Sequence, residues 1–394
     1  MRNISFKPSH PNVVISFLIL LELCSNSAAQ PPIVVRLTFE ATYSIRTEEL
    51  GVRRQQEFLA CGNTSRQLGG SYGCEENAIG SGTVVEILQG QEKDRPPADV
   101  LENHRKKITF QSSVDGSNQE AFTIIPPNVN REKTYLVVSL HSWSSDLNQR
   151  SDLESLVFKR DWCYLFPNFR GPNQHPDACG SKLAQRDILD AVEHVLKEYS
   201  LESSRVFLTG TSGGGHMTML MAGRYPDRWR AACAWVGISD LVSWHETHRG
   251  KRYGNMIEKS CGGSPTDSPL TQGEYYDRSP INFISGASEL PIALFAGIHD
   301  GHRGSVPIRQ SIDAFNVICN TNGDPLVSQS EINQLSNENG RLIQPLEGDE
   351  GYSQPLGRKY YLKRSSKSSQ LLIFEGGHEG ISSGTIDWFE RWAK

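Results

Sequence analysis

Residues 207–216 read FLTGTSGGGH, so that Ser212 lies between Gly210 and Gly214 in the pattern Gly-x-Ser-x-Gly. Apolar residues before the serine favour a strand, and the residues after it favour a helix. A serine at so sharp a strand-to-helix turn has a strained backbone, and side chains two positions before and after it would clash, so glycine is needed at both places. The motif predicts that Ser212 is a nucleophile. The alternative is a glycine-rich turn with an incidental serine.

Strand-like and helical patterns alternate on both sides of this turn, from residue 107 to the end of the chain. Strands are expected at 107–114, 120–125, 134–140, 162–166, 205–209, 231–236, 291–295 and 371–374, and helices at 183–199, 213–224, 305–318 and 386–392. Repeated β-α-β units predict an α/β fold with a mostly parallel, doubly wound sheet flanked by helices. The polar residues 320–369 favour a surface insertion with a short helix near 330–335.

A nucleophilic serine needs an imidazole to take its proton and a carboxylate to orient the imidazole. His378 lies in a glycine-flanked loop directly after the strand at 371–374, where such a base is expected. Two carboxylates come at the ends of earlier strands, Asp300 after 291–295 and Asp240 after 231–236. We expect Asp300 to be the acid, because Asp240 more naturally caps the helix or turn that follows it; Asp240 remains the alternative.

Stabilising the tetrahedral intermediate of acyl transfer requires two hydrogen-bond donors, the oxyanion hole. The Gly213 amide, at the positive end of the helix after the serine, is the first. The second should come from the loop after the strand at 134–140, with the Trp143 amide preferred and Ser142 as second choice. The Trp143 ring either forms a wall of the acyl pocket or belongs to the core. Arg170 follows the next strand and is expected to pair with a carboxylate.

Charge and ligand spacing exclude several other classes of function. The formal net charge is −5 and no basic stripe stands out, so nothing favours nucleic acid or an anionic membrane. His245 and His248 are three residues apart rather than four, unlike the His-Glu-x-x-His zinc motif, and we interpret them as surface or rim residues. We expect neither a metal nor a cofactor, and a small ester or peptide as substrate.

The N-terminal residues predict export. Residues 1–29 contain a short positive region, an apolar run at 13–23 and the small residues Ser27, Ala28 and Ala29 before Gln30, which is the signal-peptide pattern. A secreted or periplasmic location follows, with no membrane span once the leader is removed; the alternative is an N-terminal anchor. Residues 30–105 then form an extension or small β-rich subdomain, and residues 106–394 the catalytic domain.

Cysteine usage is consistent with an oxidising compartment. The predicted pairs are Cys61 with Cys74 and Cys163 with Cys179, with Cys261 and Cys319 as a weaker suggestion. Cys233 lies in an apolar run and is expected to be a buried free thiol.

Several short motifs together resemble the catalytic domain of the prolyl oligopeptidase family of serine hydrolases, in the α/β-hydrolase superfamily. They are PNFRG at 167–171, GTSGGG at 210–215, YPD at 225–227 with SDL at 239–241, GIHDG at 297–301 with VP at 306–307, and GGH at 376–378. The likeness covers roughly residues 107–394. It implies an α/β-hydrolase fold, an acyl-serine intermediate, no metal, and Ser212, Asp300 and His378 as nucleophile, acid and base.

Two departures from this family bear on the substrate. Only about 75 residues lie between the predicted leader and the core, too few for the β-propeller of many family peptidases. The expected oxyanion loop reads His-Ser-Trp where many relatives have Tyr-Gly-Gly. Both leave room for a carboxylesterase acting on acylated polysaccharide or aryl esters instead of a peptidase. A non-catalytic binding protein on the same fold is the alternative from a different class.

Overall fold

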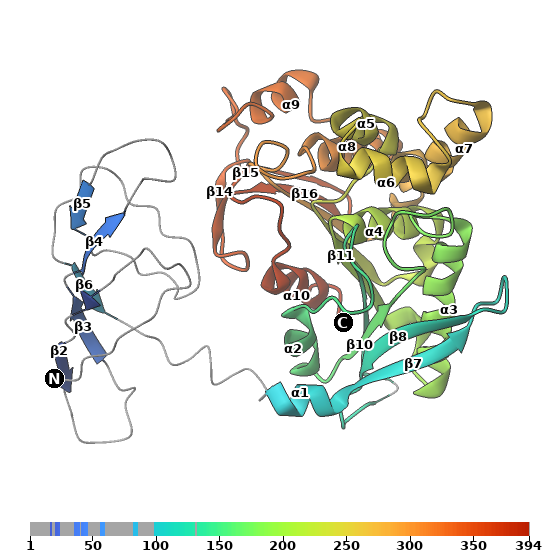
Figure 1. The fold of residues 1–394 in the computed structure, drawn as a ribbon, viewed down its shortest axis with the longest axis horizontal. Helices are drawn as coiled ribbons and strands as arrows, with labels where there is room; N and C mark the ends of the chain where they lie inside the picture. The colour runs from blue at the N-terminus through green and yellow to red at the C-terminus, as the bar shows by residue number, and fades with distance from the viewer. Residues whose placement is uncertain are drawn as a thin grey trace. The chain divides into compact units, whose positions relative to one another are not determined.

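A computed structural model of the chain describes residues 98–130 and 132–393, together with short strands between residues 16 and 85 (Figure 1). The chain divides into two units, Met1–Asp94 and Arg95–Lys394. In the first unit the described strands form two antiparallel sheets in the orders β1-β4-β5 and β2-β3-β6. Their bounds are β1 Ser16–Phe17, β2 Leu20–Leu23, β3 Val35–Phe39, β4 Ala41–Ile45, β5 Gln56–Leu59 and β6 Gly82–Val85. The predicted cleavage after Ala29 and the Cys61–Cys74 pair lie outside the described residues.

The second unit is built on one sheet of ten described strands, in the order β14-β15-β16-β13-β12-β11-β9-β10-β8-β7. The strands are β7 Arg105–Gln111, β8 Asn118–Ile124, β9 Leu136–Leu140, β10 Cys163–Pro167, β11 Val206–Thr211, β12 Ala231–Trp235, β13 Ile292–Gly297, β14 Gly351–Ser353, β15 Arg358–Ser366 and β16 Ser369–Phe374. The six strands from β16 to β10 are parallel, with antiparallel pairs at both edges. This is the mostly parallel sheet that the alternating pattern predicts.

Helices cover both faces of the sheet, as Figure 1 shows for α2 and α10 on one side and α3 and α4 on the other. The described α-helices are α1 Ala98–His104, α2 Leu153–Phe158, α3 Lys182–Glu198, α4 Gly213–Arg224, α5 Leu241–His248, α6 Arg252–Cys261, α7 Pro269–Arg278, α8 Arg309–Asn322, α9 Gln329–Leu335 and α10 Ser382–Glu390. Successive residues of a strand point to opposite faces. Val138 of β9 accordingly belongs to the apolar cluster that includes α3, α4 and α8, and Val137 to the cluster that includes α2 and α10.

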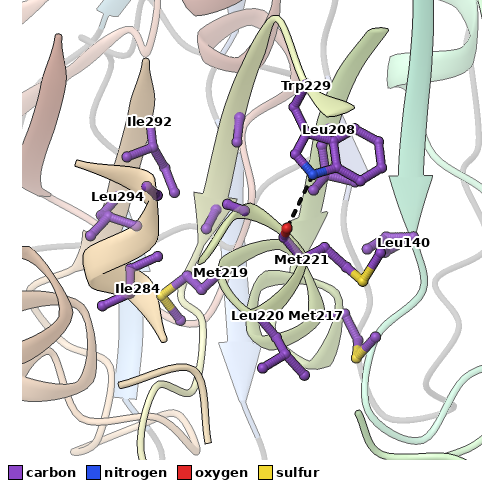
Figure 2. Packing of buried hydrophobic residues seen from close by; sticks show 14 of the residues in the cluster. Leu140, Leu208, Met217, Met219, Leu220, Met221, Trp229, Ile284, Ile292 and Leu294 are labelled. Carbon is purple, nitrogen blue, oxygen red and sulfur yellow. Dashed lines mark hydrogen bonds between the residues drawn. The ribbon is translucent and has the colours of Figure 1, made fainter. Parts of the chain in front are cut away.

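Helix α4, which follows Ser212, is buried along its length against the sheet. Figure 2 shows Met217, Met219 and Met221 among apolar side chains of the neighbouring strands, including Leu208 and Leu294. The Trp229 Nε1–H donates a hydrogen bond to the Met221 carbonyl at 3.1 Å. Each such buried side chain stabilises the fold by about 1.5–3 kcal/mol relative to an exposed one. The turn that carries Ser212 therefore rests on a firmly packed element.

Two parts of the second unit differ from the sequence-based prediction. Helices α5, α6 and α7 fill the connection between β12 and β13, where only the helix or turn capped by Asp240 was expected. Their apolar residues join Trp143 in a third cluster with Trp244 and Tyr275. The polar residues 320–369 are more than a surface insertion, because β15 within them pairs with β16 and extends the sheet. The short helix expected near 330–335 is α9.

Cysteines in the described residues are buried free thiols, so both predicted pairs among them are wrong. Cys163 and Cys319 pack in the cluster around α3, α4 and α8, whereas Cys179 and Cys261 pack in the third cluster with Trp244. The partners assigned to one another therefore belong to different parts of the core. Cys233 is a buried free thiol, as predicted.

None of the helices in the described residues combines the length and the apolar content that a membrane span requires.

Candidate active site

Ser212 lies at the turn between β11 and α4, with φ 62° and ψ −117°. A positive φ is costly for a residue with a Cβ, and such strain is tolerated only where the surrounding structure fixes it. The two glycines of the motif are required by close approach. A Cβ on Gly210 would lie 2.4 Å from the carbonyl carbon of Gly214, and one on Gly214 would lie 2.1 Å from the Leu140 oxygen.

The structure brings the three residues proposed from the sequence into one hydrogen-bonded chain. His378 follows β16 and Asp300 follows the adjacent parallel strand β13, so both lie at the carboxyl edge of the sheet. The Ser212 Oγ is 2.8 Å from His378 Nε2, and His378 Nδ1 is 2.7 Å from Asp300 Oδ2. Because a carboxylate can only accept, Nδ1 carries the hydrogen and Nε2 offers its lone pair to the serine hydroxyl.

The Asp300 carboxylate is buried and fully hydrogen-bonded. It is 2% exposed, and its second oxygen, Oδ1, accepts from the backbone N–H groups of Gly301 and Val306, both at 3.0 Å. Asp240, the alternative acid, instead caps α5 by accepting from the amides of Val242 and Ser243. Of the two candidate carboxylates, the one in contact with His378 is therefore Asp300.

Two backbone amides converge beside Ser212. A Cβ built on Gly213 would lie 2.3 Å from the Trp143 nitrogen, which shows how closely the two peptide groups approach. The Gly213 N–H belongs to the first turn of α4 and has no intrahelical acceptor. In the part of the chain that the structure describes, the Trp143 N–H likewise has no acceptor, whereas the Ser142 N–H donates to Gln149 Oε1 at 2.9 Å. The amide of Ser142, the second choice for the oxyanion hole, is thus already hydrogen-bonded within the protein.

The Trp143 ring is part of the core. It is 1% exposed and packs against the rings of Trp244, at 4.6 Å between centroids, and His216, at 5.5 Å. Of the two expectations for this side chain, a pocket wall or a core residue, the second one is met.

Arg170 has the predicted structural role. Its guanidinium is largely buried and pairs with Asp187 of α3 and with Asp115 of the β7–β8 turn. The hydrogen bond from Arg170 lowers the pKa of Asp115 well below its usual range. These contacts fix the loop after β10, which in turn holds the Trp143 loop, because the Asn173 N–H donates to the Trp143 carbonyl at 2.9 Å.

The proximity of Ser305 to His378 and the burial of His245 were not predicted from the sequence. The Ser305 hydroxyl lies 3.4 Å from His378 Nε2. The backbone carbonyl of Ser305 accepts hydrogen bonds from the Trp244 indole and the His248 ring, both at 2.7 Å. His248 is accordingly a rim residue, as expected. His245 is fully buried and contacts Glu258 at 2.7 Å, so its interpretation as a surface or rim residue is wrong. No motif or residue spacing in the sequence indicated a role for Ser305. The available signal was its position directly before the Val306-Pro307 motif.

The described residues contain no group of three or more His, Cys, Asp or Glu side chains that could hold a metal ion.

A serine, an imidazole and a buried carboxylate linked in this order, on a strand-to-helix turn of an α/β sheet, define a serine hydrolase of the α/β-hydrolase fold. Residues 150–330 match the family model described as the prolyl oligopeptidase family, so this part of the chain is similar to that family.

The chain is similar to known proteins whose names point to different substrates. The acylamino-acid-releasing enzyme of Rattus norvegicus is 29% identical over 180 residues, 42% of this chain and 23% of the relative. Feruloyl esterase B of Talaromyces funiculosus is 41% identical over 125 residues, 29% of this chain and 35% of the relative. The matches therefore span about a third or less of these relatives' own length.

A solved structure, the uncomplexed acylaminoacyl peptidase of Pyrococcus horikoshii, is similar in fold. It has a TM-score of 0.52 at 16% identity, over 91% of this chain and 53% of the other. At that identity the likeness concerns the fold alone.

Proposed function

We propose that the protein cleaves carboxylic ester or peptide bonds through an acyl-serine intermediate, with Ser212 as nucleophile, His378 as general base and Asp300 as the acid that orients it. The observation that carries the proposal is the continuous hydrogen-bonded chain Ser212 Oγ–His378–Asp300, with contacts of 2.8 and 2.7 Å. Its order and tautomer are those that acyl transfer to serine requires.

The reaction follows from this arrangement. His378 Nε2 takes the hydroxyl proton as Ser212 Oγ attacks the carbonyl carbon, and the resulting imidazolium is held by Asp300. The oxyanion is bound by the amides of Gly213 and Trp143 and by the positive end of α4. The imidazolium then gives its proton to the leaving oxygen or nitrogen. Water, deprotonated by the same imidazole, hydrolyses the acyl-serine and regenerates the hydroxyl.

A serine-directed fluorophosphonate probe tests the nucleophile. The enzyme should be labelled, and Ser212→Ala should abolish the labelling. Ser305→Ala is the matched control, because its hydroxyl also lies near His378 Nε2, at 3.4 Å; this variant should still be labelled. Labelling that survives in Ser212→Ala but is lost in Ser305→Ala would contradict the assignment. A wild-type protein that resists the probe would favour the non-catalytic binding protein.

A carboxylesterase without peptidase activity is the second candidate. It is favoured by the higher identity to a feruloyl esterase, 41%, than to an acylamino-acid-releasing enzyme, 29%. 4-Nitrophenyl acetate, methyl ferulate and acetylated xylan should then be cleaved, whereas a Gly-Pro anilide and an acetyl-alanyl anilide should not. Turnover of either anilide at a rate comparable to the esters would return the assignment to a peptidase.

We also propose that residues 1–29 are a leader removed on export to the medium or the periplasm, and that residues 30–105 form an extension of the catalytic domain, residues 106–394. The support is the apolar run at 13–23 and the small residues before Gln30. N-terminal sequencing of the exported protein should begin at Gln30; an intact N-terminus would favour the anchor.

A further inference from the structure

A hollow of about 370 Å³ opens on the surface beside α6. The lining side chains from α6 recur at the spacing of one helix face: Arg252, Asn255, Met256 and Lys259. Ser144 and Gln174 line the other side. The hollow is therefore formed between a helix and two loops that follow strands of the central sheet.

This hollow adjoins the proposed oxyanion hole. Ser144 directly follows Trp143, whose amide faces Gly213, and successive Cα atoms are only about 3.8 Å apart. Gln174 directly follows Asn173, which donates to the Trp143 carbonyl at 2.9 Å. Met256 packs in the same apolar cluster as the Trp143 ring. The hollow therefore begins one residue beyond Trp143, which contributes to the proposed oxyanion hole, and one residue beyond Asn173, which holds Trp143 in place.

The lining is cationic and rich in hydrogen-bond donors. Arg252 and Lys259 are exposed, and within the described residues neither forms an ion pair with a carboxylate. The acidic side chain next to Lys259, Glu258, is directed away and contacts the buried His245. The amides of Asn255 and Gln174 and the Ser144 hydroxyl supply further donors, and no acidic residue lines the hollow.

We propose that this hollow is an anion subsite, in which Arg252 and Lys259 bind a carboxylate carried by the substrate of Ser212. The inference rests on the proposed function and specifies its substrate class: an ester or amide with a free carboxylate near the scissile bond. Arg presents a planar fork that matches a carboxylate, and charge-assisted hydrogen bonds are about twice as strong as neutral ones. Such a carboxylate belongs either to a uronate or other acidic ester, or to a peptide C-terminus.

Matched substrates test the subsite from both sides of the scissile bond. On the acyl side, the 4-nitrophenyl monoester of adipic acid is compared with 4-nitrophenyl hexanoate. On the leaving side, 4-acetoxybenzoate is compared with 4-acetoxybenzamide. For at least one pair the anionic member should have a KM about tenfold lower, and added NaCl should reduce this preference. A Gly-Gly peptide with a free or an amidated C-terminus is then used as a competitor of 4-nitrophenyl acetate. This comparison distinguishes a peptide C-terminus from a uronate or other small acid as the source of the carboxylate.

The variant Arg252→Gln/Lys259→Gln should abolish the preference by raising the KM of the anionic ester, with kcat for 4-nitrophenyl acetate unchanged. Lys251→Gln is the control, because Lys251 is an exposed lysine next in sequence that does not line the hollow; it should retain the preference. Equal KM values within both pairs for the wild type, or a preference that survives the double substitution, would overturn the subsite. Hydrolysis of 4-nitrophenyl acetate reports separately on the proposed function.

Discussion

The substitution Asp300→Asn tests the proposed acid of the triad without changing the shape of the side chain. Asp300 Oδ1 accepts two backbone N–H groups, from Gly301 and Val306, each at 3.0 Å. An asparagine at this position must place its oxygen there, because its NH₂ group would meet two donors. The NH₂ group then faces His378 Nδ1, which becomes an acceptor. The imidazole hydrogen moves to Nε2, where it faces Ser212.

An imidazole in this tautomer has no lone pair with which to take the serine proton. We therefore expect kcat for 4-nitrophenyl acetate to fall about 10⁴-fold, equivalent to about 5.5 kcal/mol of transition-state stabilisation at 25 °C. KM should change little, because Asp300 is 2% exposed and does not reach the substrate. Steady-state kinetics give both values, and a thermal melt verifies that the variant is folded.

Asp240→Asn is the matched control, since asparagine caps a helix about as well as aspartate. It should keep activity within about twofold and lose no more than about 0.5 kcal/mol of stability. Activity of Asp300→Asn within tenfold of the wild type, or a larger loss in Asp240→Asn, would refute the assignment of the acid and the argument from the tautomer.

Three further predictions concern the oxyanion hole, metals and acid stability. Gly213→Ala should lower kcat about 10²–10³-fold, because the new Cβ would lie 2.3 Å from the Trp143 nitrogen, while Gly273→Ala, with nothing within 4 Å, should be active. Activity should persist after dialysis against EDTA; a loss restored by a divalent cation would indicate a missed metal. Burial lowers the pKa of His216 to about 4 from 6.5, so the unfolded chain binds the proton more readily and stability should fall as the pH drops from 6.5 toward 4. Melting temperatures measured across this range should depend less on pH in His216→Gln, but not in the exposed control His302→Gln.

The sequence predicted those parts of the fold in which local pattern and tertiary environment agree. The central strands are buried on both faces and read as continuous apolar runs, as for β9, β12 and β13. The turn at Ser212 was predictable because its glycines are fixed by steric contact. The positions of Asp300 and His378 followed because adjacent parallel strands end at the same edge of a sheet.

What the sequence did not predict depends on partners far along the chain. β15 is polar, with an irregular burial pattern, because an antiparallel strand near a sheet edge has one largely solvated face. α6 contains a glycine and several charges and is stabilised mainly by packing against Trp143 and Trp244. The burial of His245 requires Glu258, which comes from the next helix. For β15 and His245 the deciding contact has no signal in the neighbouring sequence, whereas α6 carries apolar residues such as Met256, Ile257 and Cys261 at helical spacing.

The loop after β9 contributes to both proposed sites, the oxyanion hole and the anion subsite, through different groups. The Ser142 amide donates to Gln149, so the amide of this loop that remains for the proposed oxyanion hole is that of Trp143. Because this donor is a backbone group fixed by its approach to Gly213, the side chain at 143 is free to pack in the core, and a Tyr-Gly-Gly sequence is not needed to provide it. Ser144, the next residue, lines the cationic hollow. We therefore expect substitutions in the hollow to alter which substrate binds without disturbing the amides proposed to stabilise its transition state, which is the separation that the paired neutral and anionic esters measure.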